Sequence, residues 1–586
     1  MTPRDRSPEP ADTSATSRRD FFRVGGLALG GLALGGAAGA AATTLTVSGR
    51  DAKVGNEPGF AHVVVLMGEN RSFDNMLGHL YTPANLPSGA TFHGLAFGTY
   101  ANTAPDGRSV PAHIYTGATD DIMCSPDPDP GETYPHVNTQ LFETVSPASN
   151  ETAWHRAIRS PYNAPPEGAT ATMGGFVRDY IANYRRTSKG AEPSTAEADV
   201  IMGGFSPTML PVLSTLASQF AVFDHWHCAV PSQTYCNRSF FHASTSHGFV
   251  TNRGGGGYEK WLDAPDTPTI FNRLDDAGVS WRIYFDEQQL VSLTGVMHAP
   301  ALEKYWKTEH FAYMDQFFED AKNGTLPAYA FIEPRMVYNH NDFHPPFGVV
   351  RGSDVDGSPV FDSAISDVRA GEALVASVYD AVRTADSSTG SHAMNTLLLI
   401  TFDEHGGTYD HVPPPAAVAP DPDEPEGEMG FRFDRLGPRV PAIAVSAYTR
   451  AGTVINDEMH HAAVIATLSA LHGLEPLTDR DRGARTLFDV TNLDTPRHPS
   501  TWPSVTPAYV PPLLDEDEVV ELKTSLKPLT SPAKGLLGLL LARYAGPGHP
   551  DPETYADAYD ILTTHGLGLF TADAGTSGPT PSPTPS

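Results

Sequence analysis

Short apolar runs rich in β-branched residues recur along the chain, without the alternation of polar and apolar positions that a half-exposed strand shows. Such runs are typical of strands covered on both faces, as in a mainly parallel sheet that lies between helices. We therefore predict strands at HVVVLM (62–67), FAVF (220–223), WRIYF (281–285), AYAFI (328–332), TLLLITF (396–402) and VPAIAVS (440–446).

Between these runs lie amphipathic stretches in which apolar residues recur at helical spacing. Three of them are MLPVLSTLASQF (209–220), GEALVASVYDAVR (371–383) and HHAAVIATLSALHGL (460–474). A chain in which strands and helices alternate forms an α/β fold with helices on both faces of the sheet. The pattern predicts a three-layer α/β/α sandwich.

The pattern changes near residue 495, where a Pro-rich linker and an acidic stretch follow the last amphipathic helix. We predict a main domain over 57–494, a small C-terminal appendage over 495–573 and a disordered Pro/Ser/Thr tail over 574–586. The appendage contains the apolar stretch GLLGLLLARYA. We expect this helix to pack on the main domain, with contact to a lipid surface as the alternative.

The charge of the chain restricts its partners. The 586 residues carry a formal net charge of −30, and 40% of them are hydrophobic, as in a globular protein with an acidic surface. Proteins that bind nucleic acid, or that are held on anionic lipid by basic patches, need clustered Lys and Arg. We expect no nucleic-acid partner and at most peripheral contact with a membrane.

The N-terminus has the features of an export signal. Paired Arg18 and Arg19 precede a weakly apolar, Gly/Ala-rich segment and then small residues suited to cleavage, a pattern typical of twin-arginine signals. The apolar segment is weaker than the roughly 20 apolar residues of a membrane span. We assign 1–42 to this signal peptide and predict a secreted or cell-surface protein exported by the twin-arginine translocation machinery.

Polar side chains follow two of the predicted strands. Glu69 and Asn70 come directly after the first run, and Asp403 and Glu404 come directly after TLLLITF. Ligands in open α/β sheets gather beyond the carboxyl ends of the strands, so both pairs can face one crevice. Carboxylates that converge repel one another unless they share a proton or a cation. Oxygen ligands of this kind suit a divalent metal ion of unspecified identity.

The stretch PSQTYCNRSFFHAS supplies a hydroxyl and a cation. Thr234 stands three residues before Asn237 and Arg238. A hydroxyl becomes a nucleophile when its pKa is lowered, and a bound metal does this without a neighbouring base. His136 and His344 lie in two further polar stretches. A histidine in such a site can protonate a leaving oxygen or bind a phosphate, with a purely structural role as the alternative.

Four stretches, in this order, resemble one family: ENRSFDNMLG, PSQTYCNRSFFHAS, FIEPRM with NDFHPP, and ITFDEHGGTYDHVPPP. They are similar to the bacterial and plant phosphoesterase family, which contains non-specific phospholipases C and acid phosphatases, over roughly residues 60–475. The resemblance implies an alkaline-phosphatase-like fold and hydrolysis of phosphoric esters. A phospholipase C that releases diacylglycerol and a phosphorylated head group is our first expectation, and a phosphomonoesterase of the acid phosphatase type is the alternative.

The resemblance also implies roles for particular residues. The metal site would consist of Glu69, Asn70, Asp403, Glu404 and Thr234. Thr234 stands where the family has its nucleophile and would form a phosphothreonine intermediate. His344 and His136 match histidines that contact the phosphoryl group or assist the leaving group, and Asn237 with Arg238 completes the nucleophile motif. His461 matches a histidine at the start of a helix, with no role assigned.

Two positions depart from the family pattern. Cys236 stands where the family commonly has Pro, and His227 stands where a large apolar residue is expected. DHWHC around His227 resembles a zinc cluster, but zinc normally needs three or four convergent ligands. Of the three cysteines, Cys228 and Cys236 can pair in an oxidising compartment, a question the sequence leaves open.

Other classes of protein find less support. The nucleophile elbow G-x-S-x-G of a serine hydrolase and the phosphate-binding loop G-x-x-x-x-G-K-[ST] are both absent. A non-enzymatic exported surface protein fits the export signal and the Pro/Ser/Thr tail, but it leaves the carboxylates at the strand ends unexplained.

Overall fold

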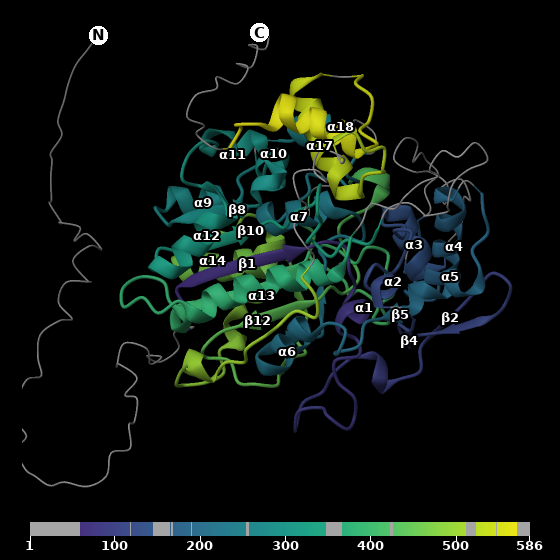
Figure 1. Ribbon diagram of the computed structural model, residues 1–586, viewed down its shortest axis with the longest axis horizontal. Coiled ribbons are helices and arrows are strands. Elements are labelled where there is room, and N and C mark those ends of the chain that lie inside the picture. Colours follow the sequence, from purple (N-terminus) through teal and green to yellow (C-terminus); the bar gives the residue numbers. More distant parts are fainter. Residues whose placement is uncertain are drawn as a thin grey trace, which may run out of the picture. The chain divides into compact units, whose positions relative to one another are not determined.

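The computed structural model describes residues 59–117, 119–143, 164–165, 168–188, 190–253, 257–265, 267–346, 366–421, 423, 426–510, 523–546 and 548–570 (Figure 1). The predicted signal peptide over 1–42 and the predicted tail over 574–586 lie outside these residues. Within the described part of the chain, no helix is both long and apolar enough to cross a membrane.

The central element is an eight-stranded sheet with the order β13-β6-β12-β11-β1-β10-β8-β9. Its strands are β1 (His62–Gly68), β6 (Ala221–Phe223), β8 (Trp281–Phe285), β9 (Phe311–Tyr313), β10 (Tyr329–Ile332), β11 (Thr396–Phe402), β12 (Ala442–Val445) and β13 (Thr453–Ile455). Neighbouring strands run parallel except on the two sides of β12, which is antiparallel to β11 and β6. All six predicted strands are present, and the mainly parallel sheet is confirmed.

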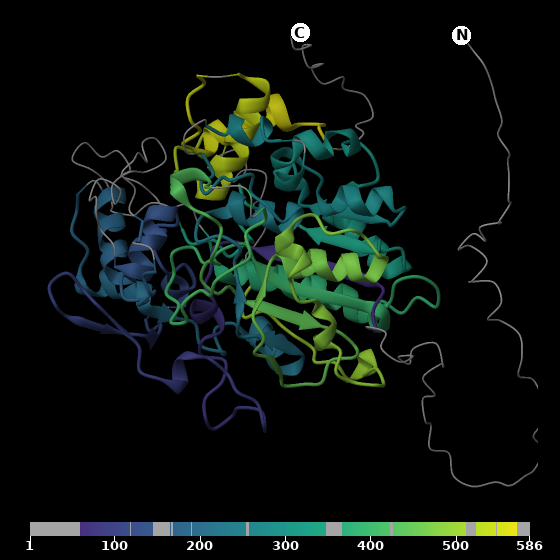
Figure 2. The same cartoon turned by 180° about the vertical axis from the view of Figure 1, so that it is seen from behind.

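Helices cover both faces of the sheet (Figures 1 and 2). One face carries α6 (Pro211–Gln219), α12 (Met314–Asn323) and α13 (Val368–Thr384), and the other carries α7 (Thr234–Ala243), α9 (Ile270–Asp276) and α14 (Ala462–His472). Alternation along β8 shows the two faces directly. Trp281 packs on Phe271 of α9 with ring centroids 4.8 Å apart, whereas Tyr284 packs on Phe317 of α12 at 5.3 Å. The predicted three-layer α/β/α architecture is confirmed.

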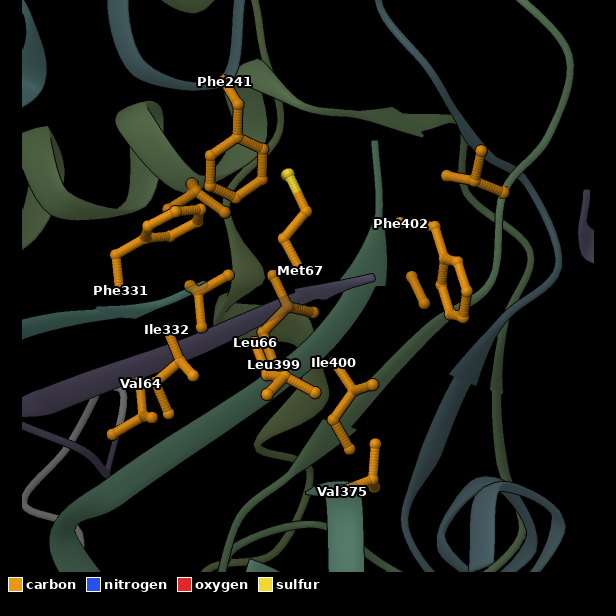
Figure 3. Packing of buried hydrophobic residues seen from close by; sticks show 14 of the residues in the cluster. Val64, Leu66, Met67, Phe241, Phe331, Ile332, Val375, Leu399, Ile400 and Phe402 are labelled. Atoms are coloured by element: carbon orange, nitrogen blue, oxygen red, sulfur yellow. The ribbon is translucent and has the colours of Figure 1, made fainter. Parts of the chain in front are cut away.

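The apolar core lies between these layers. Figure 3 shows Phe241 of α7 and Phe331 of β10 directed toward each other on one side of the sheet, with ring centroids 5.8 Å apart. Val375 of α13 and Ile400 of β11 lie together on the other side. All of β1 from Val63 to Gly68 is buried, as expected for a strand covered on both faces.

A smaller cluster of helices and short strands lies near the end of β1 (Figure 1). It contains α1 (Phe73–Leu77), α2 (Thr119–Met123), α3 (Tyr134–Phe142), α4 (Phe176–Thr187), α5 (Thr195–Asp199), β2 (Ala101–Thr103), β3 (Ser109–Pro111), β4 (His113–Ile114) and β5 (Gly203–Gly204). Val137 and Leu141 of α3 and Phe176 and Tyr180 of α4 form part of a second apolar core. This cluster places α3 beside the carboxyl end of the sheet.

The C-terminal region packs on the main domain. Its helices are α17 (Ser531–Tyr544) and α18 (Tyr555–Ile561). The residues of α17 from Ser531 to Leu541 are buried, and the helix contacts α10 (Leu293–Met297) and α8 (Glu259–Leu262). A Cβ atom on Gly535 would lie 2.5 Å from the Tyr235 hydroxyl oxygen, so glycine permits the close approach of α17 to α7. The apolar side chains of α17 are therefore covered by protein, as predicted.

Candidate active site

The two polar strand ends meet at the carboxyl edge of the sheet. Gly68, the last residue of β1, pairs with Phe402, the last residue of β11. Glu69, Asn70 and Asp403 follow directly, and the backbone N–H of Asn70 donates to Asp403 Oδ1 at 3.0 Å. Like Glu404, these residues are completely buried. The structure thus brings the two strand ends together as the sequence predicted.

A glycine allows this approach. Asn70 adopts a left-handed backbone conformation, with φ 54°, which Asn tolerates better than most residues. Gly406 is also left-handed, with φ +60°, and a Cβ there would overlap the Asn70 carbonyl oxygen. Gly406 therefore has a steric role, because a side chain there would push the two strand ends apart.

Thr234 begins α7 and faces the strand ends. Its Oγ1 lies 3.4 Å from Glu69 Oε2 and 3.4 Å from Asn70 Oδ1. Arg238, one turn further along α7, donates to Glu69 through Nη2, and its Nε lies 3.8 Å from Asp403 Oδ2. The helix thus places a hydroxyl and a guanidinium over the same carboxylates.

Asn237 holds the turn that precedes α7. Its Nδ2 donates to the carbonyl oxygens of Val230 at 3.1 Å, Ser232 at 2.9 Å and Gln233 at 3.2 Å, and its Oδ1 accepts from the N–H of Val230 at 2.9 Å. The Asn237 side chain is therefore used within the turn that presents Thr234.

The departures from the family pattern lie in buried surroundings. Cys236 and Cys228 are both buried and free, so the disulfide left open by the sequence is not formed. Burial raises the pKa of the Cys236 thiol, which keeps it protonated at neutral pH. His227 donates through Nδ1 to the Gly437 carbonyl oxygen at 3.0 Å, and His225 pairs with Asp224. Neither metal-binding group found among the described residues includes a member of DHWHC.

Glu132 is a site residue that sequence reasoning missed. It precedes α3, is 4% exposed, and accepts from Asn70 Nδ2 at 2.7 Å and from Gln233 Nε2 at 3.0 Å. It therefore contacts both the first strand end and the residue before Thr234. Only His136 was predicted as a site residue in this stretch, because Glu132 does not follow a predicted strand.

Burial and mutual repulsion disturb the four carboxyl groups. Burial is the main cause that raises the pKa of Glu69 well above its usual value; Arg238 opposes this effect and Asp403 adds to it. Burial is also the main cause that raises the pKa of Glu404 well above its usual value, and the negative charges of Glu132 and Asp403 add to this effect. The pKa values of Asp403 and Glu132 are raised as well, again mainly by burial. One arginine does not compensate for four buried carboxylates.

These donors fit a divalent cation. Asp403 Oδ2 and Glu404 Oε1 are buried and have no hydrogen-bond partner among the described residues. Unpartnered buried carboxylate oxygens are costly unless a cation or a proton satisfies them. Together with Asn70 Oδ1 and the Thr234 hydroxyl they form an oxygen-rich set of the kind that magnesium, manganese or calcium prefers.

The three histidines have different partners. His136 Nδ1 donates to Asp179 Oδ1 at 2.7 Å. His344 Nδ1 donates to the Pro345 carbonyl oxygen at 2.6 Å, and burial lowers the pKa of His344 to about 4. The Nε2 atoms of both are buried without a hydrogen-bond partner among the described residues. Both ring nitrogens of His461 form hydrogen bonds. Its Nε2 donates to the Asp403 carbonyl oxygen at 2.5 Å, and its Nδ1 accepts from Trp226 Nε1 at 3.3 Å.

A second acidic group, which includes Asp74 of α1, is already paired with an arginine. Asp74, Asp410 and His411 bring possible ligand atoms within 4.8 Å of one another. However, Arg439 donates to Asp410 Oδ1 and to Asp74 Oδ1, each at 2.9 Å. This buried guanidinium occupies the place of a cation and ties α1 to the loop after β11.

Comparison with known proteins found similar sequences and structures. A sequence model of the Phosphoesterase family matches residues 60–475. The chain is 33% identical over 464 residues to the Arabidopsis thaliana protein named non-specific phospholipase C6, with 76% of this chain and 75% of that protein covered. It is 24% identical over 448 residues to phospholipase C A of Mycobacterium tuberculosis, with 70% of this chain and 73% of that protein covered. A solved structure from Vibrio parahaemolyticus, described as a protein in the alkaline phosphatase superfamily, shares 12% identity and a TM-score of 0.28 over 62% of this chain and 83% of that chain.

Proposed function

Since the chain belongs to the Phosphoesterase family, we propose that it is an exported, metal-dependent phospholipase C whose nucleophile is Thr234. The observation that carries this proposal is the position of the Thr234 hydroxyl, 3.4 Å from both Glu69 and Asn70, at the start of a helix and above four buried carboxylates. Relatives of the chain named phospholipases C support a phosphodiester of a glycerophospholipid as the substrate.

The residues that would hold the metal are Glu69, Asn70, Asp403, Glu404 and Thr234. A divalent cation bound there would polarise a phosphoryl oxygen and lower the pKa of the Thr234 hydroxyl. Arg238 favours the ionised forms of Glu69 and Asp403 and fixes their orientation, because it contacts both carboxylates. Asn237 has a positioning role, since its amide group holds the turn that carries Thr234.

The chemistry proceeds in two displacements. Thr234 Oγ1 loses its proton and attacks phosphorus, so that an Oγ–P bond forms and the P–O bond to diacylglycerol breaks. The departing oxygen takes up a proton. Water then attacks the phosphothreonine, which releases the phosphorylated head group and returns a proton to Thr234. The N-terminal end of α7 favours the negative charge of the phosphoryl group in both steps.

His136 is our candidate for the proton donor. Its Nδ1–H is held by Asp179, which orients the ring, and its buried Nε2 is unpartnered among the described residues. A carboxylate-backed imidazole of this kind serves as a general acid or base. The partner of His344 Nδ1 is a neutral carbonyl group, so His344 lacks that support.

Export through the twin-arginine pathway is part of the proposal and rests on the sequence of residues 1–42. Fusing these residues to a folded reporter should deliver the reporter outside the cytoplasm of a bacterial host. Replacing Arg18 and Arg19 by Lys in the same fusion should retain the reporter inside. Equal export of both fusions would contradict this assignment.

The activity is tested by comparing two substrates with and without a chelator. Phosphatidylcholine micelles should yield diacylglycerol and phosphocholine, faster than an aryl phosphomonoester yields phosphate, and chelation should abolish both reactions. Cleavage of the monoester alone would identify a phosphomonoesterase. Full activity in a chelator that removes all bound metal would contradict metal dependence.

A further inference from the structure

A second group of ligand atoms lies next to the proposed metal site. The group consists of Asp129, Glu132 and His344. Each residue offers one possible ligand atom, and these three atoms lie within 4.8 Å of one another. The three residues are 3%, 4% and 0% exposed. We propose that Asp129, Glu132 and His344 bind a second divalent cation, of the zinc or manganese class, with Glu132 between the two metal sites.

The free atoms of this group are suited to a metal. Asp129 Oδ1 and His344 Nε2 are buried and have no hydrogen-bond partner in the described part of the chain. His344 Nδ1 donates its proton to the Pro345 carbonyl oxygen at 2.6 Å, so Nε2 keeps its lone pair. A carbonyl partner on the far nitrogen is the usual arrangement of a metal-binding histidine, because it fixes the tautomer and the ring orientation.

The backbone holds both ligands in place. The N–H of Asp129 donates to the Pro346 carbonyl oxygen at 2.7 Å, which joins the loop of Asp129 to the loop of His344. The Asp129 carbonyl oxygen accepts from Asn183 Nδ2 at 2.6 Å, and the N–H of His344 donates to Asp342 Oδ1 at 3.1 Å. Neither side chain needs to move far to bind an ion.

The group lacks a direct ion-pair partner, although Arg71 and Arg186 both act on Asp129 from nearby. Among the described residues, no Lys or Arg forms an ion pair with Asp129 or Glu132. Arg71 is a nearby buried cation, but it donates to the carbonyl oxygens of Phe343 and Ser125 and to Asn75 Oδ1. Two buried carboxylates without an ion-pair partner are stabilised by a cation or by protons. The imidazole favours a transition metal over calcium or magnesium.

Glu132 joins this group to the first site. Its Oε2 contacts Asn70 Nδ2 and its Oε1 contacts Gln233 Nε2, so it lies between the first strand end and the residue before Thr234. Paired metal ions stabilise the attacking and the leaving oxygen in phosphoryl transfer. That role rests on the proposed function, whereas binding of the second ion does not.

Metal stoichiometry tests the inference on the full chain. The protein is stripped with a chelator, dialysed to equilibrium against Zn²⁺ or against Mn²⁺, and analysed for bound metal. We expect about two equivalents for the unaltered chain and about one for Asp129→Asn. The matched control Asp127→Asn alters an aspartate two positions away, outside the group, and should keep two equivalents. One equivalent in the unaltered chain, or two in Asp129→Asn, would overturn the proposal.

Anomalous scattering gives a readout that needs no variant. Crystals loaded with Zn²⁺ should show a peak enclosed by Asp129, Glu132 and His344, besides the peak at Glu69 and Asp403. A peak at the first site alone would mean that the second group is satisfied by protons. Two bound ions without hydrolysis of any phosphoester would refute the proposed function and leave this inference intact. Hydrolysis with only one bound ion would support the proposed function and refute this inference.

Discussion

Replacing Arg238 by Met should destabilise the metal-free protein in a pH-dependent way. The guanidinium contacts Glu69 and lies 3.8 Å from Asp403 Oδ2, with all three side chains completely buried. Two unit charges at that separation interact by about 4 kcal/mol at an effective dielectric constant of about 20. Breaking a buried ion pair from one side typically costs about 3–5 kcal/mol, because it leaves an unpaired buried charge. We therefore expect Arg238→Met to lower the free energy of unfolding by about 3–5 kcal/mol at pH 8.

The sign of the pH dependence follows from the carboxyl groups. Burial raises the folded-state pKa of Glu69 and of Asp403 above their usual values, and Arg238 opposes this rise. Without Arg238 both pKa values rise further, so the folded variant binds more protons than the unfolded chain. Stability then increases as the pH falls. The deficit of Arg238→Met should shrink between pH 8 and pH 5.5.

Urea unfolding in chelator, at several pH values, measures this deficit. Arg480→Met is the matched control, because Arg480 is also buried but donates to three carbonyl oxygens, those of Val418, Ala229 and Phe433. Its deficit should change little with pH. A deficit of Arg238→Met below about 1 kcal/mol, or one with the flat pH profile of the control, would refute the reasoning about the carboxylate cluster.

Three further predictions concern the site. Thr234→Ala should lower kcat at least about 10³-fold with little change in Tm. Isolation of a Thr234 peptide that carries the phosphorylated head group would check the intermediate, and near-normal turnover of the variant would contradict the mechanism. Gly406→Ala should weaken metal binding and lower Tm, since its Cβ meets a carbonyl oxygen at φ +60°. Gly430→Ala is the control: at φ +74° its Cβ would meet only Glu426 Oε2, at an ordinary contact distance of 3.9 Å, so this variant should bind metal normally. His136→Asn and Asp179→Asn should each slow lipid cleavage by about 10²–10⁴-fold. Both variants should slow cleavage of a p-nitrophenyl phosphoester less, because p-nitrophenolate leaves without taking up a proton. Equal losses on both substrates would contradict the role of His136 as a proton donor.

The framework of the fold could be predicted from the sequence because buried parallel strands have a simple pattern. The runs at 62–67 and 396–402 are continuous and apolar, and they became neighbouring central strands. Once both are placed in one sheet, the polar residues after each strand must lie at the same edge. The contact between Asn70 and Asp403 could therefore be predicted from the placement of these two strands alone.

Glu132 could not be predicted in this way because tertiary packing places it. It lies before α3, and α3 is positioned by its apolar contacts with α4, some forty residues away in sequence. No periodicity in the stretch that contains Glu132 indicates which side of the sheet it approaches. The positioning role of Asn237 was hidden for a similar reason, since its partners are backbone atoms of a turn without a sequence signature.

The C-terminal region is separate from the main domain in composition, but its packing connects it to the candidate site. Composition separates it from the main domain near residue 495, and the family match ends at residue 475. Yet Gly535 of α17 packs against Tyr235, the residue that follows the candidate nucleophile. Thr530, before α17, lies within hydrogen-bond distance of His340, which donates to Asp342, and the Asp342 carbonyl oxygen accepts from the N–H of Glu69. Two chains of contact thus join α17 to the site, one through α7, which carries the candidate nucleophile, and one through Glu69, a proposed metal ligand. A substitution in α17 that leaves the sheet intact can therefore alter the geometry around Thr234.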